Sequence, residues 1–388
     1  MNLEGRISID LSYPSHDTGV VTLSSSRPVH ASTLFEGKTI EETLQTLPLL
    51  FSICSTAQAC AAVRACEQAT KSQPPTGVEP IRQQLLSIEM IREHLWRILL
   101  GWSERVGTPP PESALAEVMR LQQELRQSLT AGDSPFRIVV SPFEPDMASF
   151  QQAVQQLKAL LKQTVLGVDC STWLQIESID QLHQWISRQQ GVATQLLHKI
   201  WQQQWHGLGR CLIPPLPTLE WDRLNQALSH SNYVEQPEWA GEPAETTPLT
   251  RTDSPLLHQL QLEYGNGLLV RLIARLTELA QLVESLDQPH SSTPSPVGFA
   301  SGESGIGCCE AARGLLVHRV TLENEQIRQY QILAPTEWNF HPDGVVVRAL
   351  QQLPAESPHL QQQASLIIHA IDPCVGYDLT INQRPPAH

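Results

Sequence analysis

Residues 309–342 read CEAARGLLVHRVTLENEQIRQYQILAPTEWNFHP, and this stretch decides the fold that we expect. Its apolar and polar side chains alternate on both sides of the short polar segment 323–326. Such alternation around a turn is typical of two antiparallel strands. The stretch therefore predicts a β-hairpin, followed by the irregular residues 334–344 and a final helical segment.

The N-terminal part of the chain carries a second strand pattern and an unusual helix. Residues 5–25 alternate around the turn-like segment 14–19, which predicts two antiparallel strands. Residues 49–69, LLFSICSTAQACAAVRACEQA, are rich in Ala, Cys and Ser. Small side chains let a helix approach its neighbours closely, so we expect this helix to be central and buried.

The middle of the chain is rich in Gln and Leu and predicts a helical bundle. A 3.6-residue apolar period occurs in the segments 81–102, 113–130, 147–162 and 255–286. Breaks rich in Pro, Gly, Ser or Thr occur at 107–111, 236–255 and 288–307, and the last two are candidate mobile loops.

We expect a single domain over residues 1–388, built from three consecutive parts. These are the N-terminal hairpin and first cysteine helix in 1–70, the helical bundle in 78–286, and the hairpin with the C-terminal cysteine segment in 308–388.

Composition excludes several classes of partner. The formal net charge of -14 argues against nucleic acid, which requires clustered Lys and Arg. No apolar run approaches the roughly 18 residues of a membrane-spanning helix, so we expect no membrane insertion. The opening MNLEGRISID lacks the features of an export signal, which makes a cytoplasmic location the expectation.

The eight cysteines form no C-x-x-C pair and no zinc-type quartet. In a reducing compartment, most of them are expected to be small buried hydrophobes.

Two segments at opposite ends of the chain nevertheless resemble the metal-binding halves of [NiFe]-hydrogenase large subunits. The sequence LFSICSTAQACAAVRACE resembles the family pattern C-G-I-C-x-x-x-H, with Cys54 at the second cysteine. The sequence IDPCVGYDL resembles D-P-C-x-x-C, with Asp372, Pro373 and Cys374 matching.

The opening stretch 309–342 resembles the family's E-A-P-R-G-x-x-x-H segment, its hairpin and its P-T-x-W-N turn. This match runs through Glu310, Arg313, Gly314, His318, Tyr330, Pro335, Thr336, Trp338 and Asn339. LEGRISIDL also resembles the R-x-E-G-H-L start, with Glu4 and Gly5 kept and Arg6 replacing the histidine.

The chain thus resembles a degenerate large subunit of the HupK/HoxV accessory type. The resemblance implies an α+β, mainly helical fold, with a large-subunit-like helical core and small N-terminal and C-terminal β-hairpins.

The resemblance leaves only two of the family's four nickel thiolates. Phe51 replaces the first cysteine, Tyr377 the last, and Gln58 the histidine. Phenylalanine has no donor atom and a free phenol loses its proton only near pH 10, so a tetrathiolate nickel site cannot form. We expect no nickel and no hydrogenase activity.

Iron is a different case from nickel, because the family's iron carries one CO and two cyanides. These three ligands fill half of its six octahedral coordination positions. About three positions remain, and Cys54 and Cys374 could occupy two of them. The resemblance matches Cys54 to a bridging thiolate and Cys374 to a nickel-terminal one, so the ligand set must be rearranged. It also implies that Arg313, Pro335 and Thr336 surround the cyanides, whose nitrogens accept hydrogen bonds.

The main hypothesis is a non-enzymatic scaffold that transiently carries Fe(CN)2CO. It would receive this unit from iron-loading maturation proteins of the HypC/HypD type and deliver it to the apo hydrogenase large subunit. The alternative is a catalytically inactive structural subunit of a redox complex, and a third hypothesis is a residual oxidoreductase. Thr380 stands at the position of the histidine that precedes the family's protease cut, so we expect no proteolytic maturation.

Structural alternatives accompany these functional interpretations. Cys54 could be a core residue, as we expect of Cys60 and Cys66, whereas an exposed Cys308–Cys309 pair would be redox-reactive. Arg313 could pair with a buried acid, and Thr336 could belong to an ordinary turn.

A further group is interpreted structurally. Glu4 is interpreted as a solvated carboxylate. Three histidines are interpreted as structural residues: His318, His341 and His369. Four tryptophans indicate either a packed core or a docking face: Trp173, Trp185, Trp201 and Trp205.

The loss of two of the four nickel thiolates should abolish hydrogenase activity. Nickel-replete protein should show no hydrogen-dependent dye reduction above a protein-free blank, because no four-sulfur nickel site can assemble. Turnover that depends on added nickel would instead support the residual oxidoreductase.

Overall fold

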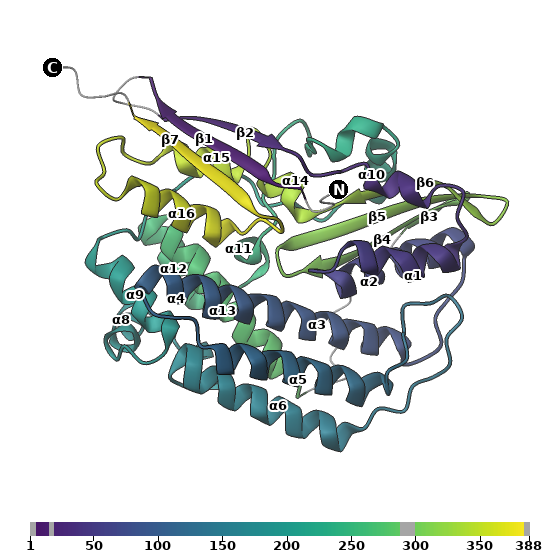
Figure 1. The fold of residues 1–388 in the computed structure, drawn as a ribbon, viewed down its shortest axis with the longest axis horizontal. Helices are drawn as coiled ribbons and strands as arrows, with labels where there is room; N and C mark the ends of the chain where they lie inside the picture. The colour runs from purple at the N-terminus through teal and green to yellow at the C-terminus, as the bar shows by residue number, and fades with distance from the viewer. Residues whose placement is uncertain (1–4, 15–18, 288–298, 384–388) are drawn as a thin grey trace.

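Two small sheets lie above a layer of long helices in the computed structural model, which describes residues 5–14, 19–287 and 299–383 (Figure 1). The strand orders are β2-β1-β7 and β3-β4-β5-β6. The strands are β1 (Ile7–Tyr13), β2 (Val20–Ser25), β3 (Phe299–Ser301), β4 (Ser304–Ala311), β5 (Gly314–Glu323), β6 (Gln326–Leu333) and β7 (Tyr377–Gln383).

Helices form most of the remaining structure, and the mainly helical α+β fold is confirmed. The α-helices are α1 (Ile40–Leu50), α2 (Ser55–Thr70), α3 (Val78–Trp96), α4 (Ser103–Val106), α5 (Glu112–Thr130), α6 (Met147–Leu161), α7 (Cys170–Leu174), α8 (Ile179–Ser187), α9 (Val192–Gln202), α10 (Trp221–Leu228), α11 (Pro248–Arg251), α12 (Pro255–Tyr264), α13 (Leu268–Ser285), α14 (Pro335–Asn339), α15 (Val345–Gln351) and α16 (Leu360–Ile371). A π-helical segment, η2 (Arg97–Trp102), continues α3. None of the described helices is both long and apolar enough to cross a membrane.

The first sheet joins the two ends of the chain. Strand β1 pairs antiparallel with β2, which confirms the predicted N-terminal hairpin, and parallel with β7. The side chains of Ile7, Ile9 and Leu11 point into the core, and burying each contributes roughly 1.5–3 kcal/mol. The C-terminal strand was not predicted, because its partner lies at the other end of the sequence.

The second sheet contains the predicted hairpin of β5 and β6, and helix α2 packs tightly against β4. The contact is close because β4 carries Gly305 and Gly307: a Cβ at Gly307 would lie 2.3 Å from the carbonyl oxygen of Ala61. Almost all of α2 is buried, as its small side chains predicted.

Two predicted helices proved to be interrupted. Residues 49–69 are not one helix, because α1 ends at Leu50 and α2 begins at Ser55. Residues 255–286 form two helices, with Gly265 (φ +65°) in the break, where a Cβ would clash with Arg210.

The predicted loops also contain ordered structure. Segment 236–255 holds α11 and the buried Glu245, Thr246 and Thr247, so its Thr-rich composition serves hydrogen bonding within the core. Within 288–307, residues 288–298 lie outside the described residues, and the rest contains β3 and part of β4.

Of the four tryptophans that the sequence singled out, three belong to the core. Trp173, Trp185 and Trp205 are buried, and Trp201 is half-buried. The rings of Trp173 and Trp185 pack at a centroid distance of 4.6 Å. Trp173, Trp185 and Trp205 therefore follow the packed-core interpretation.

The contact between α2 and β4 can be tested with two matched glycine substitutions. Gly307→Ala should lower the free energy of unfolding by about 3 kcal/mol, because its methyl group would overlap backbone atoms of α2. Gly207→Ala should change it by less than about 0.5 kcal/mol, since its nearest atom would lie at 3.5 Å. Equal unfolding midpoints in urea would contradict the observed packing.

Candidate functional site

The two cysteines predicted as metal ligands differ from the other six in exposure. Cys54 and Cys374 are half-buried, whereas the others are buried: Cys60, Cys66, Cys170, Cys211, Cys308 and Cys309. Core positions for Cys60 and Cys66 are therefore confirmed. The exposure that would make Cys308 and Cys309 redox-reactive is not observed, because β4 buries both side chains completely.

Cys54 lies at the N-terminal end of α2, after the turn that follows α1. The Glu89 carboxylate from α3 accepts hydrogen bonds from two N–H groups of the first turn of α2, at Thr56 (2.7 Å) and Ala57 (2.9 Å). These groups have no partner within the helix, and the positive end of the helix dipole favours a carboxylate. Glu89 thereby stabilises the helix start that positions Cys54.

The environment of Cys54 favours its neutral thiol. Burial, assisted by the negative charge of Glu89, raises the pKa of Cys54 to about 12. The sulfur accepts a hydrogen bond from Nε2 of Gln58 at 3.7 Å. Binding a metal at this sulfur would therefore require the release of a proton.

Cys374 lies in the turn between α16 and β7. Asp372 ends α16 in a left-handed conformation with φ 72°. The hydroxyl of Thr336 donates a hydrogen bond to Sγ of Cys374 at 3.1 Å and accepts one from its backbone N–H at 3.4 Å. Thr336 thus binds the C-terminal thiol directly and is not merely part of a turn.

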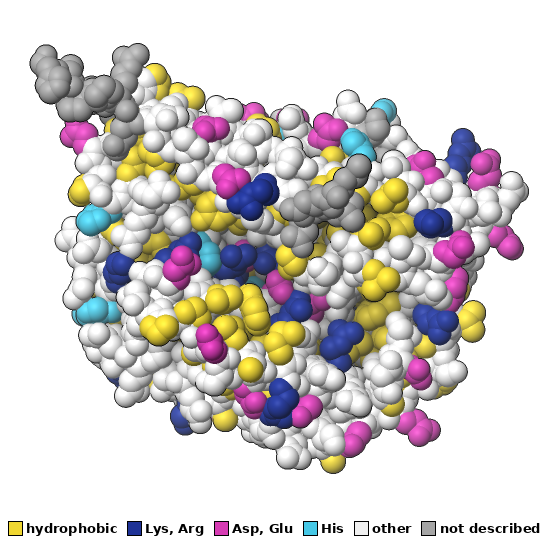
Figure 2. Space-filling view, in the orientation of Figure 1, with side chains coloured by type: hydrophobic (Ala, Val, Ile, Leu, Met, Phe, Trp, Pro, Cys, Tyr) yellow, Lys and Arg dark blue, Asp and Glu magenta, His cyan; other side chains and the backbone are white. Residues whose placement is uncertain are grey.

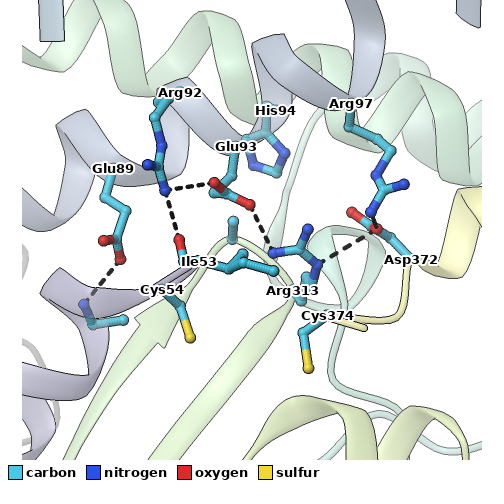
Figure 3. A network of polar contacts seen from close by, with 12 residues as sticks. Ile53, Cys54, Glu89, Arg92, Glu93, His94, Arg97, Arg313, Asp372 and Cys374 are labelled. Carbon is cyan, nitrogen blue, oxygen red and sulfur yellow. Dashed lines mark hydrogen bonds and ion pairs between the residues drawn. The ribbon is translucent and has the colours of Figure 1, made fainter. Parts of the chain in front are cut away.

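All five residues that the sequence singled out line one cavity of about 100 Å³. They are Cys54, Arg313, Pro335, Thr336 and Cys374. Both sulfurs point to the same side of the neighbouring arginine–carboxylate network (Figure 3). The structure brings these residues together, and their roles as iron or cyanide ligands stay predictions.

Arg313 is held by two acids while it faces the cavity. Its Nη1 donates a hydrogen bond to Glu93 at 2.9 Å, and its Nε lies 3.4 Å from a carboxylate oxygen of Asp372 (Figure 3). Arg92 contacts Glu93 and also donates a hydrogen bond to the carbonyl of Ile53 at 2.5 Å. Arg313 therefore pairs with buried acids, as the structural alternative expected, and it also lines the cavity.

Asp372 is the buried centre of this network. Burial favours its neutral form, but the positive charges of Arg313, Arg97 and Arg275 outweigh burial and hold the pKa of Asp372 well below its usual range. Arg275 donates a hydrogen bond to it at 3.0 Å, and Arg97 forms an ion pair with its other oxygen. The ionised carboxylate fixes the turn from which Cys374 projects.

Several residues of the cavity were not predicted from the sequence, among them Arg27 and Glu337. Arg27 follows β2, belongs to no recognised motif and forms an ion pair with Glu337 of α14. Burial lowers the pKa of Arg27, but the ion pair with Glu337 contributes to an overall rise, so the guanidinium remains charged. Glu337 lay inside the recognised P-T-x-W-N segment, whereas no sequence signal marked Arg27.

The substituted family positions fall on two different surfaces. Phe51 and Gln58 line the cavity with the two thiols. Tyr377 does not, because it begins β7, and its hydroxyl lies 3.2 Å from that of Ser365. No group of three or more His, Cys, Asp or Glu side chains in the described ranges is arranged to hold a metal ion.

The three histidines are buried, which agrees with their structural interpretation. His318 shares a hydrogen bond with the Tyr330 hydroxyl at 2.8 Å, and burial lowers the pKa of His318 to about 3. His341 accepts a hydrogen bond from the N–H of Asp343. His369 borders a neighbouring groove, and Glu4 lies outside the described residues.

Sequence comparison finds relatives over nearly the whole chain. The hydrogenase expression/formation protein HupV of Azotobacter chroococcum mcd 1 is 30% identical over 381 residues, which cover 98% of this chain and 99% of HupV. HupK of Azotobacter vinelandii is 29% identical, with coverage of 98% and 99%. The chain belongs to this family of hydrogenase expression/formation proteins.

Hydrogenases themselves also resemble this chain, in sequence over part of it and in fold over most of it. A family profile described as nickel-dependent hydrogenase matches residues 266–377. The [NiFeSe] hydrogenase of D. vulgaris Hildenborough superimposes with a TM-score of 0.63 at 15% identity, covering 92% of this chain and 95% of the hydrogenase chain. The large-subunit-like fold inferred from the sequence is confirmed.

Thiol alkylation tests the exposure and protonation of the site cysteines. In native, iron-free protein, iodoacetamide should modify Cys54 and Cys374 before the six buried cysteines, as read by peptide mass spectrometry. Because only the thiolate reacts and the pKa of Cys54 is raised to about 12, its labelling rate should rise about tenfold per pH unit above neutrality. Cys54→Ser is the control, and equally fast labelling of Cys60 or Cys309 would contradict this structure.

Proposed function

We propose that this chain is a non-enzymatic scaffold that carries the Fe(CN)2CO unit during assembly of the [NiFe]-hydrogenase cofactor. Membership of the hydrogenase expression/formation family supports a role in hydrogenase maturation. The observation that carries the finer proposal is the meeting of Cys54 and Cys374, from opposite ends of the chain, at one cavity with Arg313 and Thr336.

The donor set suits this cargo. Ferrous iron and two cyanides have no formal net charge, and the three diatomic ligands leave about three coordination positions. The two thiolates would occupy two positions and make the bound unit formally dianionic. Arg27 and Arg313 line the same cavity and would offset this charge.

The cavity also offers hydrogen-bond donors for the cyanide nitrogens. The guanidinium of Arg313 is oriented by Glu93 and Asp372, so its position is set before the cargo binds. The Thr336 hydroxyl already lies beside Sγ of Cys374. These groups would distinguish a cyanide-bearing iron from a bare ferrous ion, which has no acceptor atoms to offer.

Loading and release follow from the chemistry of the thiols. Because Cys54 is neutral before loading, binding iron transfers its thiol proton to solvent or to the donor protein. Reprotonation of the two thiolates would assist release of the iron unit. The unit would arrive from maturation proteins of the HypC/HypD type and pass to the apo hydrogenase large subunit.

Infrared spectroscopy tests the carrier proposal directly. Protein purified anaerobically after co-expression with the iron-loading maturation proteins should show CO and cyanide stretching bands. Cys54→Ser and Cys374→Ser should each lose at least about nine-tenths of the band intensity per protein, because one iron bond disappears. Cys211→Ala, which removes a thiol outside the cavity, should retain the bands.

Two outcomes would overturn the proposal. Bands that persist in both serine variants would place the diatomic ligands elsewhere. Stable copurification with an iron–sulfur subunit, with no diatomic bands in the unsubstituted protein, would instead support a structural subunit of a redox complex. Circular dichroism of each variant would show that loss of the bands does not reflect unfolding.

A further inference from the structure

A second, larger depression adjoins the thiol cavity. This groove encloses about 1090 Å³ and shares Ile53, Glu93, Arg313 and Cys374 with the cavity. Residues of α3, η2 and α4 line one side, and residues near the junction of α16 and β7 line the other. Figure 2 shows a hollow in this face where Lys or Arg side chains lie beside hydrophobic ones.

The groove is basic although the chain as a whole is acidic. Five arginines line it against two glutamates: Arg6, Arg92, Arg97, Arg105 and Arg313; Glu93 and Glu104. Asp372 beneath the wall and Asp378, which pairs with Arg6, offset most of this charge, so the groove keeps only a small positive excess, whereas the formal charge of the whole chain is -14. A local reversal of sign at a concave surface attracts an anionic partner.

Buried polar groups in the walls lack partners within the described structure. The His369 side chain is only 5% exposed, and its Nε2 has no hydrogen-bond partner. The ring packs so closely on Gly101 that a Cβ there would lie 2.1 Å from it. The Nε groups of Arg92 and Arg105 are likewise buried without a partner in the described structure.

The rim of the groove is apolar. Trp96 and Met119 are 40% and 44% exposed, and Leu100, Pro109 and Pro110 continue the surface. A small inorganic anion would use none of this surface and would fill a minor part of the volume. Pockets of roughly 300–1,000 Å³ hold ligands with many heavy atoms, so the groove has room for several side chains.

We propose that this groove binds an acidic peptide segment of a partner protein, with its carboxylates on the groove arginines and its apolar side chains on Trp96 and Met119. The shared wall at Arg313 and Cys374 means that a bound segment lies beside the opening to the thiol cavity. The proposal requires no iron and is independent of the carrier function.

Fluorescence anisotropy with the full, iron-free chain tests the groove. The probe is a short fluorescein-labelled peptide in which Asp and Glu alternate with Leu, and the control peptide replaces each acid by Lys. The acidic peptide should bind, the Lys peptide should not, and binding should weaken as salt rises.

Groove variants identify the binding surface. Arg105→Gln and the more exposed Arg6→Gln should each weaken binding about tenfold, which is the loss expected for one charge-assisted contact. Trp96→Ala should weaken it several-fold. Arg120→Gln and Leu262→Ala, at exposed sites outside the groove, should leave the affinity unchanged.

Three results would overturn the proposal. They are equal binding of the acidic and Lys peptides, unchanged affinity in both arginine variants, and undiminished binding after each Asp and Glu of the peptide is replaced by Leu. The peptide assay uses no iron, so its failure is distinct from a failure of the infrared experiment.

Discussion

The buried carboxylate of Asp372 is the interaction on which the rest of the site depends. It binds Arg97, Arg275 and Arg313, which come from η2, α13 and the turn before β5. A buried charge that loses its partners costs several kcal/mol, so these four residues constrain one another strongly. The same residue ends α16 in a left-handed turn, and only Pro373 separates it from Cys374. One carboxylate therefore couples the helical core, the cavity arginine and the C-terminal thiol.

Cys54 reaches the same cavity by a separate route. The glycines of β4 let α2 approach closely, and Glu89 fixes the N-terminal end of that helix. The parallel pairing of β1 with β7 joins the two ends of the chain in the neighbouring sheet. The two thiols thus converge through packing and strand pairing, without a disulfide between any of the eight cysteines.

The cavity and the groove differ in the kind of ligand that each suits. The cavity combines two thiols with buried guanidinium and hydroxyl groups, which suits an iron unit with cyanide ligands. The groove combines arginines with an apolar rim, which suits a peptide. Because Arg313 and Cys374 belong to both, a protein bound in the groove would control access to whatever the thiols hold. The proposed carrier function would use such a shared wall when cargo is exchanged with another protein.

The amino-acid sequence by itself determined both hairpins, most of the helices and all five candidate site residues, because these signals are local periodicity or short motifs. It could not determine the extra strand β7, the break at Gly265, the cavity positions of Arg27 and Glu337, or the basic groove. Each of these depends on contacts between residues far apart in the chain, and no local pattern encodes such a contact. The tertiary structure alone decided that Cys54 and Cys374 share a cavity, since their proximity arises from the packing of α2 on β4 and from the charges around Asp372.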